Sequence, residues 1–228
     1  MSNRNYVANG NCNVIIIMVI LCYMLLFLNG FYYPLFLKIG KSVVWGVDIV
    51  QTLIVFIVMT KVYLKIKDNL VAVKSSGNNI LITVVTNGFH YIIVPLLFYY
   101  IYIVSIGSAA IIFPKNYLYQ YSLQNIPLLE NKLFIIPFCL IIAVEEELLF
   151  RVSLTYILEN IFELSGFFIL TLSALMFASV HWEQGTNSLL GTFILGIFAV
   201  AYYYKTRRVL PLIIGHFITL LNIYFEFY

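Results

Sequence analysis

The sequence predicts an all-α protein, a polytopic transmembrane helix bundle with about seven spans, or eight if its longest apolar run is divided. Hydrophobic residues make up 62% of the 228 residues and charged residues only 10%, a composition typical of membrane proteins. Several apolar runs reach the ~20 residues that a helix needs to cross a bilayer. Basic residues lie between these runs, as in other membrane proteins. The net charge of +3 does not indicate a nucleic-acid partner.

The N-terminal half contains three apolar runs that predict spans, at residues 14–37, 43–64 and 80–113. In the first run, Asn29, Gly30 and Pro34 predict a kink packed against neighbouring helices, because bare lipid would leave the freed backbone groups unsatisfied. A helix over the third run would be ~50 Å long at 1.5 Å per residue. We therefore expect one long helix there, kinked near Pro95 and interfacial in its first part. A loop rich in Tyr, Asn and Pro follows at residues 114–131.

The C-terminal half contains four further runs that predict spans, at residues 132–158, 167–182, 188–204 and 209–225. With seven spans, one side of the membrane carries eight basic residues and the other carries four. The eight are Arg4, Lys61, Lys65, Lys67, Lys74, Lys205, Arg207 and Arg208, and the four are Lys38, Lys41, Lys115 and Lys132. Because basic residues favour the cytosolic side, we expect a cytosolic N-terminus. We expect the protein in a bacterial plasma membrane.

Three adjacent carboxylates and one guanidinium interrupt the apolar run at residues 132–158: Glu145, Glu146, Glu147 and Arg151. Each charge at mid-bilayer costs at least ~2.5–3.5 kcal/mol, so the group is expected to be functional. Glu147 and Arg151 stand four residues apart and can pair on one helix face, a pair that can also serve only to fix helix packing. Glu146 points about 100° away from Glu147 around the helix axis, so it does not share the Arg151 partner and is free to take part in a reaction. Glu145 is expected to face another helix or a pocket rim.

Two histidines of the C-terminal half are expected to meet these carboxylates. If residues 160–165 form a hairpin turn, Glu146 lies 16 residues before residue 162 and His181 lies 19 after it. Antiparallel helices then bring the two side chains to depths that differ by about one turn. His216 lies eight residues beyond Arg208 and can join them from the last span. The predicted pocket holds Glu146, Glu147, Arg151, His181 and His216.

This set of side chains can activate water. A carboxylate in an apolar site can take a proton from water near neutral pH, and an adjacent imidazole can orient that water. A second imidazole can donate to the oxygen on which negative charge develops. Two histidines and a glutamate also form a zinc ligand set, so Glu146, His181 and His216 can alternatively hold a divalent metal. The sequence contains no HExxH motif to decide between them, and we favour the mechanism without a metal.

At these residues the sequence resembles the CAAX-protease and bacteriocin-processing family (CPBP, or Abi) of intramembrane proteases. The family motif E-E-x-x-x-R corresponds to residues 146–151 and F-x-x-x-H to residues 177–181. The third motif, H-x-x-x-N/D, begins at His216 but has Leu220 at its last position. Thr219 lies one residue before that position and Asn222 two residues after it.

The resemblance implies Glu146 as general base, His181 as its water-positioning partner and His216 as oxyanion donor or metal ligand. Glu147, Arg151, Thr219 and Asn222 would have supporting roles. It implies a peptide hydrolase of the glutamate or metalloprotease type, acting on a membrane-associated or prenylated peptide within the lipid bilayer. Residues 132–228 would form the catalytic core, and residues 1–131 the N-terminal helices and interfacial loop of one integral membrane domain.

A non-enzymatic membrane protein is the alternative that the sequence leaves open. A bacteriocin self-immunity protein or a proton-coupled transporter could use the same carboxylates. A proton relay needs carboxylates along a path, whereas here they cluster on one helix opposite histidines.

The charge count slightly favours a pocket that opens to the non-cytosolic side. His90 has no companion motif and is expected to be structural or interfacial, and Asp48 and Gln51 can hydrogen-bond between helices.

Overall fold

The computed structural model describes residues 9–67, 70, 86–113 and 132–225, and every regular element in these ranges is a helix. The predicted all-α fold class is confirmed. Three of the described helices are long and apolar enough to cross a bilayer, and a bent helix pair makes up to four. The chain is an integral membrane protein, while the total of seven or eight spans stays a prediction.

The first predicted span is two helices, α1 (Asn9–Phe27) and α2 (Asn29–Leu37), which meet at an angle of 43°. The break frees the backbone carbonyl of Phe27, and the indole N–H of Trp182 donates a hydrogen bond to it at 2.9 Å. Gly30 follows the break, and a Cβ at this position would lie 2.2 Å from the Trp182 ring. The predicted kink is therefore fixed by a distant tryptophan that fits only against glycine.

Two further N-terminal helices follow, α3 (Lys41–Ile66) and α5 (Val94–Ile112). Residues 86–112 form one apolar helix, and a π-helical turn in it, η2 (Phe89–Ile93), ends two residues before Pro95. A Pro lacks the N–H of a regular helix, so a widened turn beside it is expected. The interfacial segment expected at the start of this run and the loop at residues 114–131 lie largely or wholly outside the described residues.

The C-terminal half begins with a continuous helical rod made of α6 (Lys132–Glu147), the π-helical segment η4 (Leu148–Ser153) and α7 (Leu154–Asn160). The helices α8 (Gly166–Ser179), α9 (Thr186–Thr206) and α10 (Leu210–Phe225) follow it. A 3₁₀ turn, η5 (Trp182–Gln184), connects α8 to α9. The expected helix over residues 167–182 ends earlier, at Ser179, so His181 lies in a turn rather than in a span.

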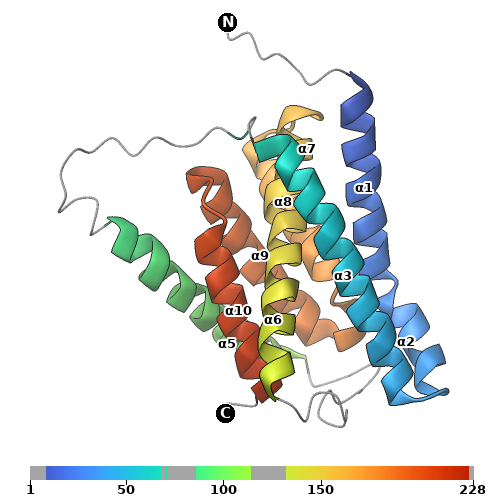
Figure 1. The fold of residues 1–228 in the computed structure, drawn as a ribbon. Coiled ribbons are helices and arrows are strands. Elements are labelled where there is room, and N and C mark those ends of the chain that lie inside the picture. The colour runs from blue at the N-terminus through green and yellow to red at the C-terminus, as the bar shows by residue number, and fades with distance from the viewer. Residues whose placement is uncertain (1–8, 68–69, 71–85, 114–131, 226–228) are drawn as a thin grey trace, which may run out of the picture.

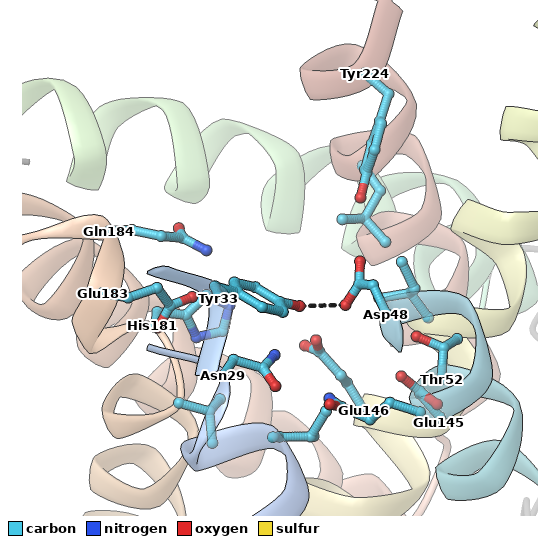
Figure 2. A pocket seen from close by; sticks show the side chains of 15 residues that line it. Asn29, Tyr33, Asp48, Thr52, Glu145, Glu146, His181, Glu183, Gln184 and Tyr224 are labelled. Carbon is cyan, nitrogen blue, oxygen red and sulfur yellow. Dashed lines mark hydrogen bonds between the residues drawn. The ribbon is translucent and has the colours of Figure 1, made fainter. Parts of the chain in front are cut away.

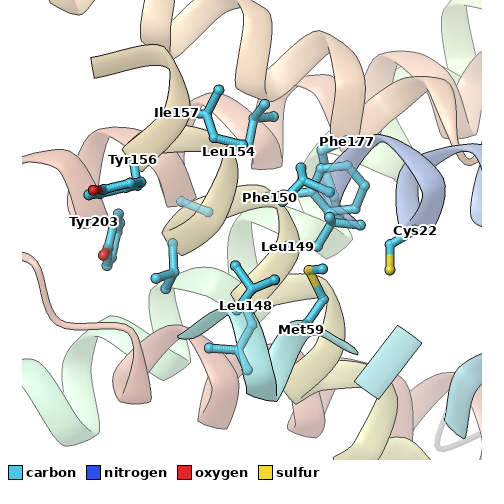
Figure 3. Close-up of a cluster of buried hydrophobic side chains, with 14 of the residues drawn as sticks. Cys22, Met59, Leu148, Leu149, Phe150, Leu154, Tyr156, Ile157, Phe177 and Tyr203 are labelled. Carbon is cyan, nitrogen blue, oxygen red and sulfur yellow. The ribbon is translucent and has the colours of Figure 1, made fainter. Parts of the chain in front are cut away.

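The rod lies at the centre of the bundle (Figure 1). Segment η4 contacts α1, α3, α8 and α9, and all residues from Leu148 to Leu158 are buried. Figure 3 shows Leu149 and Phe150 packed near Phe177 of α8, with Met59 and Cys22 close by. Because this packing surrounds the rod, the carboxylates just before η4 are held inside the bundle.

Candidate active site

The three glutamates at the end of α6 face three different surroundings, because successive helical residues point about 100° apart. Glu145 and Glu147 are buried, with 1% and 0% of their surface exposed. Glu145 lies beside Thr52 of α3, and Glu146 points into the pocket of Figure 2. Glu147 points to α10 and to Arg151.

Glu147 is the centre of a buried charged cluster. Its Oε2 lies 3.3 Å from Nε of Arg151, so the predicted pair between residues four apart is formed. Its Oε1 lies 3.0 Å from Nδ1 of His216. The Arg151 guanidinium lies 4.0 Å from the centre of the Phe177 ring, a cation–π distance. Glu147 is thus a carboxylate with two cationic or donor partners.

His216 lies between the two neighbouring carboxylates. While Nδ1 faces Glu147, its Nε2 lies 3.7 Å from Oε2 of Glu146. The imidazole stacks on Phe98 of α5, with ring centres 5.6 Å apart and an angle of 26° between the planes. The stacking and the Glu147 contact fix the ring, so Nε2 is held toward Glu146.

A pocket of about 130 Å³ lies between α2, α3, α6, α10 and η5 (Figure 2). This volume has room for several water molecules or for one side chain, since water takes about 30 Å³ in the liquid. Glu146 and His181 both line the pocket, as the hairpin register predicts. The lining residues are Leu26, Asn29, Tyr33, Asp48, Gln51, Thr52, Ile142, Glu145, Glu146, Val180, His181, Glu183, Gln184, Leu220 and Tyr224.

The ring of His181 is oriented by the last turn of α8, the helix that precedes it. Nδ1 lies 3.0 Å from the Phe177 carbonyl oxygen, which can only accept, so Nδ1 carries the proton and donates it. In the neutral ring, Nε2 is then the nitrogen with a lone pair. The edge of this ring also packs on Phe177, with ring centres 5.1 Å apart.

The other predicted site residues lie away from the pocket wall. His216, Glu147 and Arg151 form the buried cluster behind Glu146, and none of the three lines the pocket. The Thr219 hydroxyl donates to the Gly215 carbonyl in its own helix at 2.9 Å. The Asn222 side chain is buried, and its Nδ2 has no hydrogen-bond partner among the described residues.

Sequence reasoning did not assign several pocket residues to the site. Asn29 and Tyr33 come from α2, and the Tyr33 hydroxyl donates a hydrogen bond to Asp48 of α3. The signal for Asp48 was a lone charge in an apolar run, interpreted as an interhelical contact. Glu183 follows the predicted span at residues 167–182 and is only 4% exposed; burial raises its pKa, while nearby His181 opposes the rise.

The predicted metal ligands do not converge in this structure. Among the described residues, no group of three or more His, Cys, Asp or Glu side chains is arranged to hold a metal ion. Nε2 of His216 lies 3.7 Å from Glu146, while His181, in the turn after α8, lines the same pocket as Glu146. The preference for a mechanism without a metal stays a prediction.

The C-terminal part of the chain matches a family of known proteins. Residues 128–221 match the family model described as type II CAAX prenyl endopeptidase, Rce1-like. This range contains Glu146, Glu147, Arg151, His181 and His216, and it ends just before Asn222. No match was found among curated proteins or among solved structures. The resemblance to the CPBP family is thus confirmed for residues 128–221 of this membrane protein, the part of the chain that matches the Rce1-like CAAX prenyl endopeptidases.

Proposed function

We propose that this protein is an intramembrane endopeptidase that hydrolyses a peptide bond of a membrane-associated substrate with water activated by Glu146. One observation carries the proposal. Glu146 faces a pocket opposite His181, while the adjacent Glu147 is engaged by Arg151 and His216. One carboxylate is thus available to a substrate and the other is not.

Glu146 is the general base in this proposal. Water in the pocket donates one proton to the Glu146 carboxylate and attacks the scissile carbonyl carbon. The tetrahedral intermediate then collapses, the C–N bond breaks, and Glu146 returns the proton to the leaving amine. The surrounding apolar helices keep bulk water away, so the electrostatic interactions within the site are strengthened.

His181 positions the attacking water. With Nδ1–H donated to the Phe177 carbonyl, Nε2 can accept a hydrogen bond from the second O–H of that water, which stays on the oxygen. The oxygen of the water then presents its lone pair to the substrate. This role matches the one that the family resemblance implies.

His216 acts through Glu146 rather than on the substrate. Glu147 accepts a hydrogen bond from the Nδ1–H group of His216. Nε2 is therefore the ring nitrogen that faces the Glu146 carboxylate and interacts with its charge. This replaces the expected role of His216 as oxyanion donor or ligand. The amide of Gln51 is a better candidate donor, because it lines the pocket and its Nε2 has no hydrogen-bond partner among the described residues.

Peptides that reach the pocket from the bilayer are the proposed substrates, in keeping with the prenylated substrates of the matched family. The pocket lies at the η5 end of α9, and the basic residues 205–208 lie at the other end. If that basic end is cytosolic, the pocket opens to the outer face. Single cysteines at Gln184 and Thr206 test this with an impermeant thiol reagent on intact cells. Labelling of Thr206 alone would mean that the orientation is inverted.

The function itself is tested with Glu146→Gln, which keeps the shape of the side chain and removes the base. Purified protein in bilayer discs is given a mixture of acylated and prenylated peptides, and the products are sequenced by mass spectrometry. We expect cleavage by the wild type and by the control Glu163→Gln, which alters an exposed carboxylate, but none by Glu146→Gln. Cleavage by all three at one rate, or by none, would favour the transporter or immunity protein.

A further inference from the structure

The pocket beside Glu146 carries an excess of acidic side chains. Four carboxylates line it: Asp48, Glu145, Glu146 and Glu183. No Lys or Arg lines it, and His181 is the one basic group on its wall among the described residues. The proposed hydrolysis uses only one of these carboxylates, so three acidic groups need another explanation.

Two of these carboxylates are buried, and one oxygen atom of each has no hydrogen-bond partner among the described residues. Oε2 of Glu145 and Oε2 of Glu183 have no hydrogen-bond partner among the described residues, and the two side chains are 1% and 4% exposed. A buried acceptor without a partner costs ~1–3 kcal/mol, and more when it is charged. Glu147 differs in having Arg151 and His216 beside it as built-in partners, although its own Oε2 also lacks a hydrogen bond among the described residues.

The unsatisfied carboxylates belong to one electrostatic group. Asp48 lies within electrostatic range of Glu145, Glu146 and Glu183. Its position is fixed by the Tyr33 hydroxyl, which donates to it across the gap between α2 and α3 (Figure 2). Like charges held this close repel one another, and a cation between them would remove the repulsion and supply the missing donors.

We propose that this pocket binds a basic side chain, lysine or arginine, of the peptide substrate next to the scissile bond. The inference rests on the proposed protease function, because Glu146 and the three further carboxylates share one pocket. An ammonium group has three donors and a guanidinium has five, enough to satisfy Glu183, Asp48 and Glu145 together. Asp48 and Glu183 are then specificity residues, while Glu146 remains the base.

The source of the specificity lies partly outside the family-matched segment. Asp48 and Tyr33 belong to α3 and α2, before residue 128, and Trp182, next to Glu183 in η5, packs on Phe31 of α2. The N-terminal helices therefore complete the binding pocket of the C-terminal domain.

Binding is tested on full-length Glu146→Gln protein in bilayer discs, so that cleavage cannot interfere. The probes are acylated peptides that differ only by lysine or norleucine at one position, with that position moved along the peptide. We expect the best lysine peptide to bind about tenfold more tightly than its norleucine twin, as for a charge-assisted contact. Adding Glu183→Gln or Asp48→Asn should reduce this ratio severalfold, while adding Glu163→Gln should leave it unchanged. Equal binding of the twins at every position would overturn the proposal, as would an equal loss with Glu163→Gln.

Cleavage of the same peptides by the wild type separates this inference from the proposed function. Equal cleavage of lysine and norleucine peptides that stops with Glu146→Gln would refute the cation site and keep the protease. A lysine preference in binding without cleavage of any peptide would refute the protease and keep the cation site.

Discussion

The imidazole of His216 is held by Glu147, with Nδ1 3.0 Å from the carboxylate Oε1. The contact aims Nε2 at Glu146, 3.7 Å away. The two adjacent carboxylates of the E-E-x-x-x-R motif are therefore joined through one histidine from the last helix. One of them is paired with Arg151, and the other faces the pocket.

His216→Gln tests this connection. We expect kcat to fall by about 10²–10³, within the range for a lost proton-transfer partner, and KM to change little. Glu147→Gln should act through the same ring, so the double variant should lose little more than either single variant. Additive losses in steady-state assays would mean that His216 and Glu147 act separately.

Arg151 neutralises Glu147 in a fully buried position. Arg151→Met should lower the free energy of unfolding by about 3–5 kcal/mol, because it leaves a buried carboxylate charge without its partner. Adding Glu147→Gln should restore much of this loss. Unfolding in detergent by heat or denaturant measures both effects.

Arg207 offers a matched control for Arg151. It pairs with Glu159 at 2.6 Å, but the two side chains are 17% and 24% exposed. Arg207→Met should therefore cost about 1 kcal/mol or less. Equal losses for Arg151→Met and Arg207→Met would contradict a special electrostatic role for Arg151.

Gly30 allows α2 to approach Trp182, the neighbour of His181. Gly30→Ala places a methyl group 2.2 Å from the indole ring and should displace α2 or the η5 turn. We expect activity to fall by an order of magnitude or more, since a shift of about 1 Å can cost about 10²-fold. Gly107→Ala, with nothing within 4 Å of its new Cβ, should keep full activity. Normal activity of purified Gly30→Ala would show that this contact does not position the site.

Chelation tests whether the mechanism needs a metal. If Glu146, His181 and His216 were ligands, Glu147 would be the remaining base, and Glu147 is engaged by Arg151 and His216. We therefore expect unchanged activity after treatment with a strong chelator and no stoichiometric zinc in the active protein. Zinc at one atom per chain, lost together with activity, would overturn this expectation.

The sequence was sufficient for the parts of the site that depend on helix periodicity. Spacing along one helix predicted the Glu147–Arg151 pair, and the length of the α7–α8 hairpin predicted that Glu146 and His181 would share a pocket. Helix periodicity does not predict contacts that depend on tertiary packing. The bend between α1 and α2, which brings Tyr33 to Asp48, depends on Trp182, which lies 155 residues after the Phe27 carbonyl that it binds.

The apolar pattern of the sequence also did not predict where the helices end. The apolar run through Trp182 predicted a helix to that residue, but α8 ends at Ser179, and Glu183 turns inward in η5. The π-helical segment at residues 148–153 has no signal in hydrophobic periodicity. Both features determine which polar side chains reach the pocket.

Cleavage in water labelled with heavy oxygen tests the central claim most directly. Wild-type protein in bilayer discs is given a peptide that it cuts, and the mass of the new C-terminal carboxylate is measured. The account predicts one heavy oxygen atom in that carboxylate from the first turnover, and no product from Glu146→Gln. A product without heavy oxygen, or a labelled product formed equally fast by Glu146→Gln, would contradict water activation by Glu146.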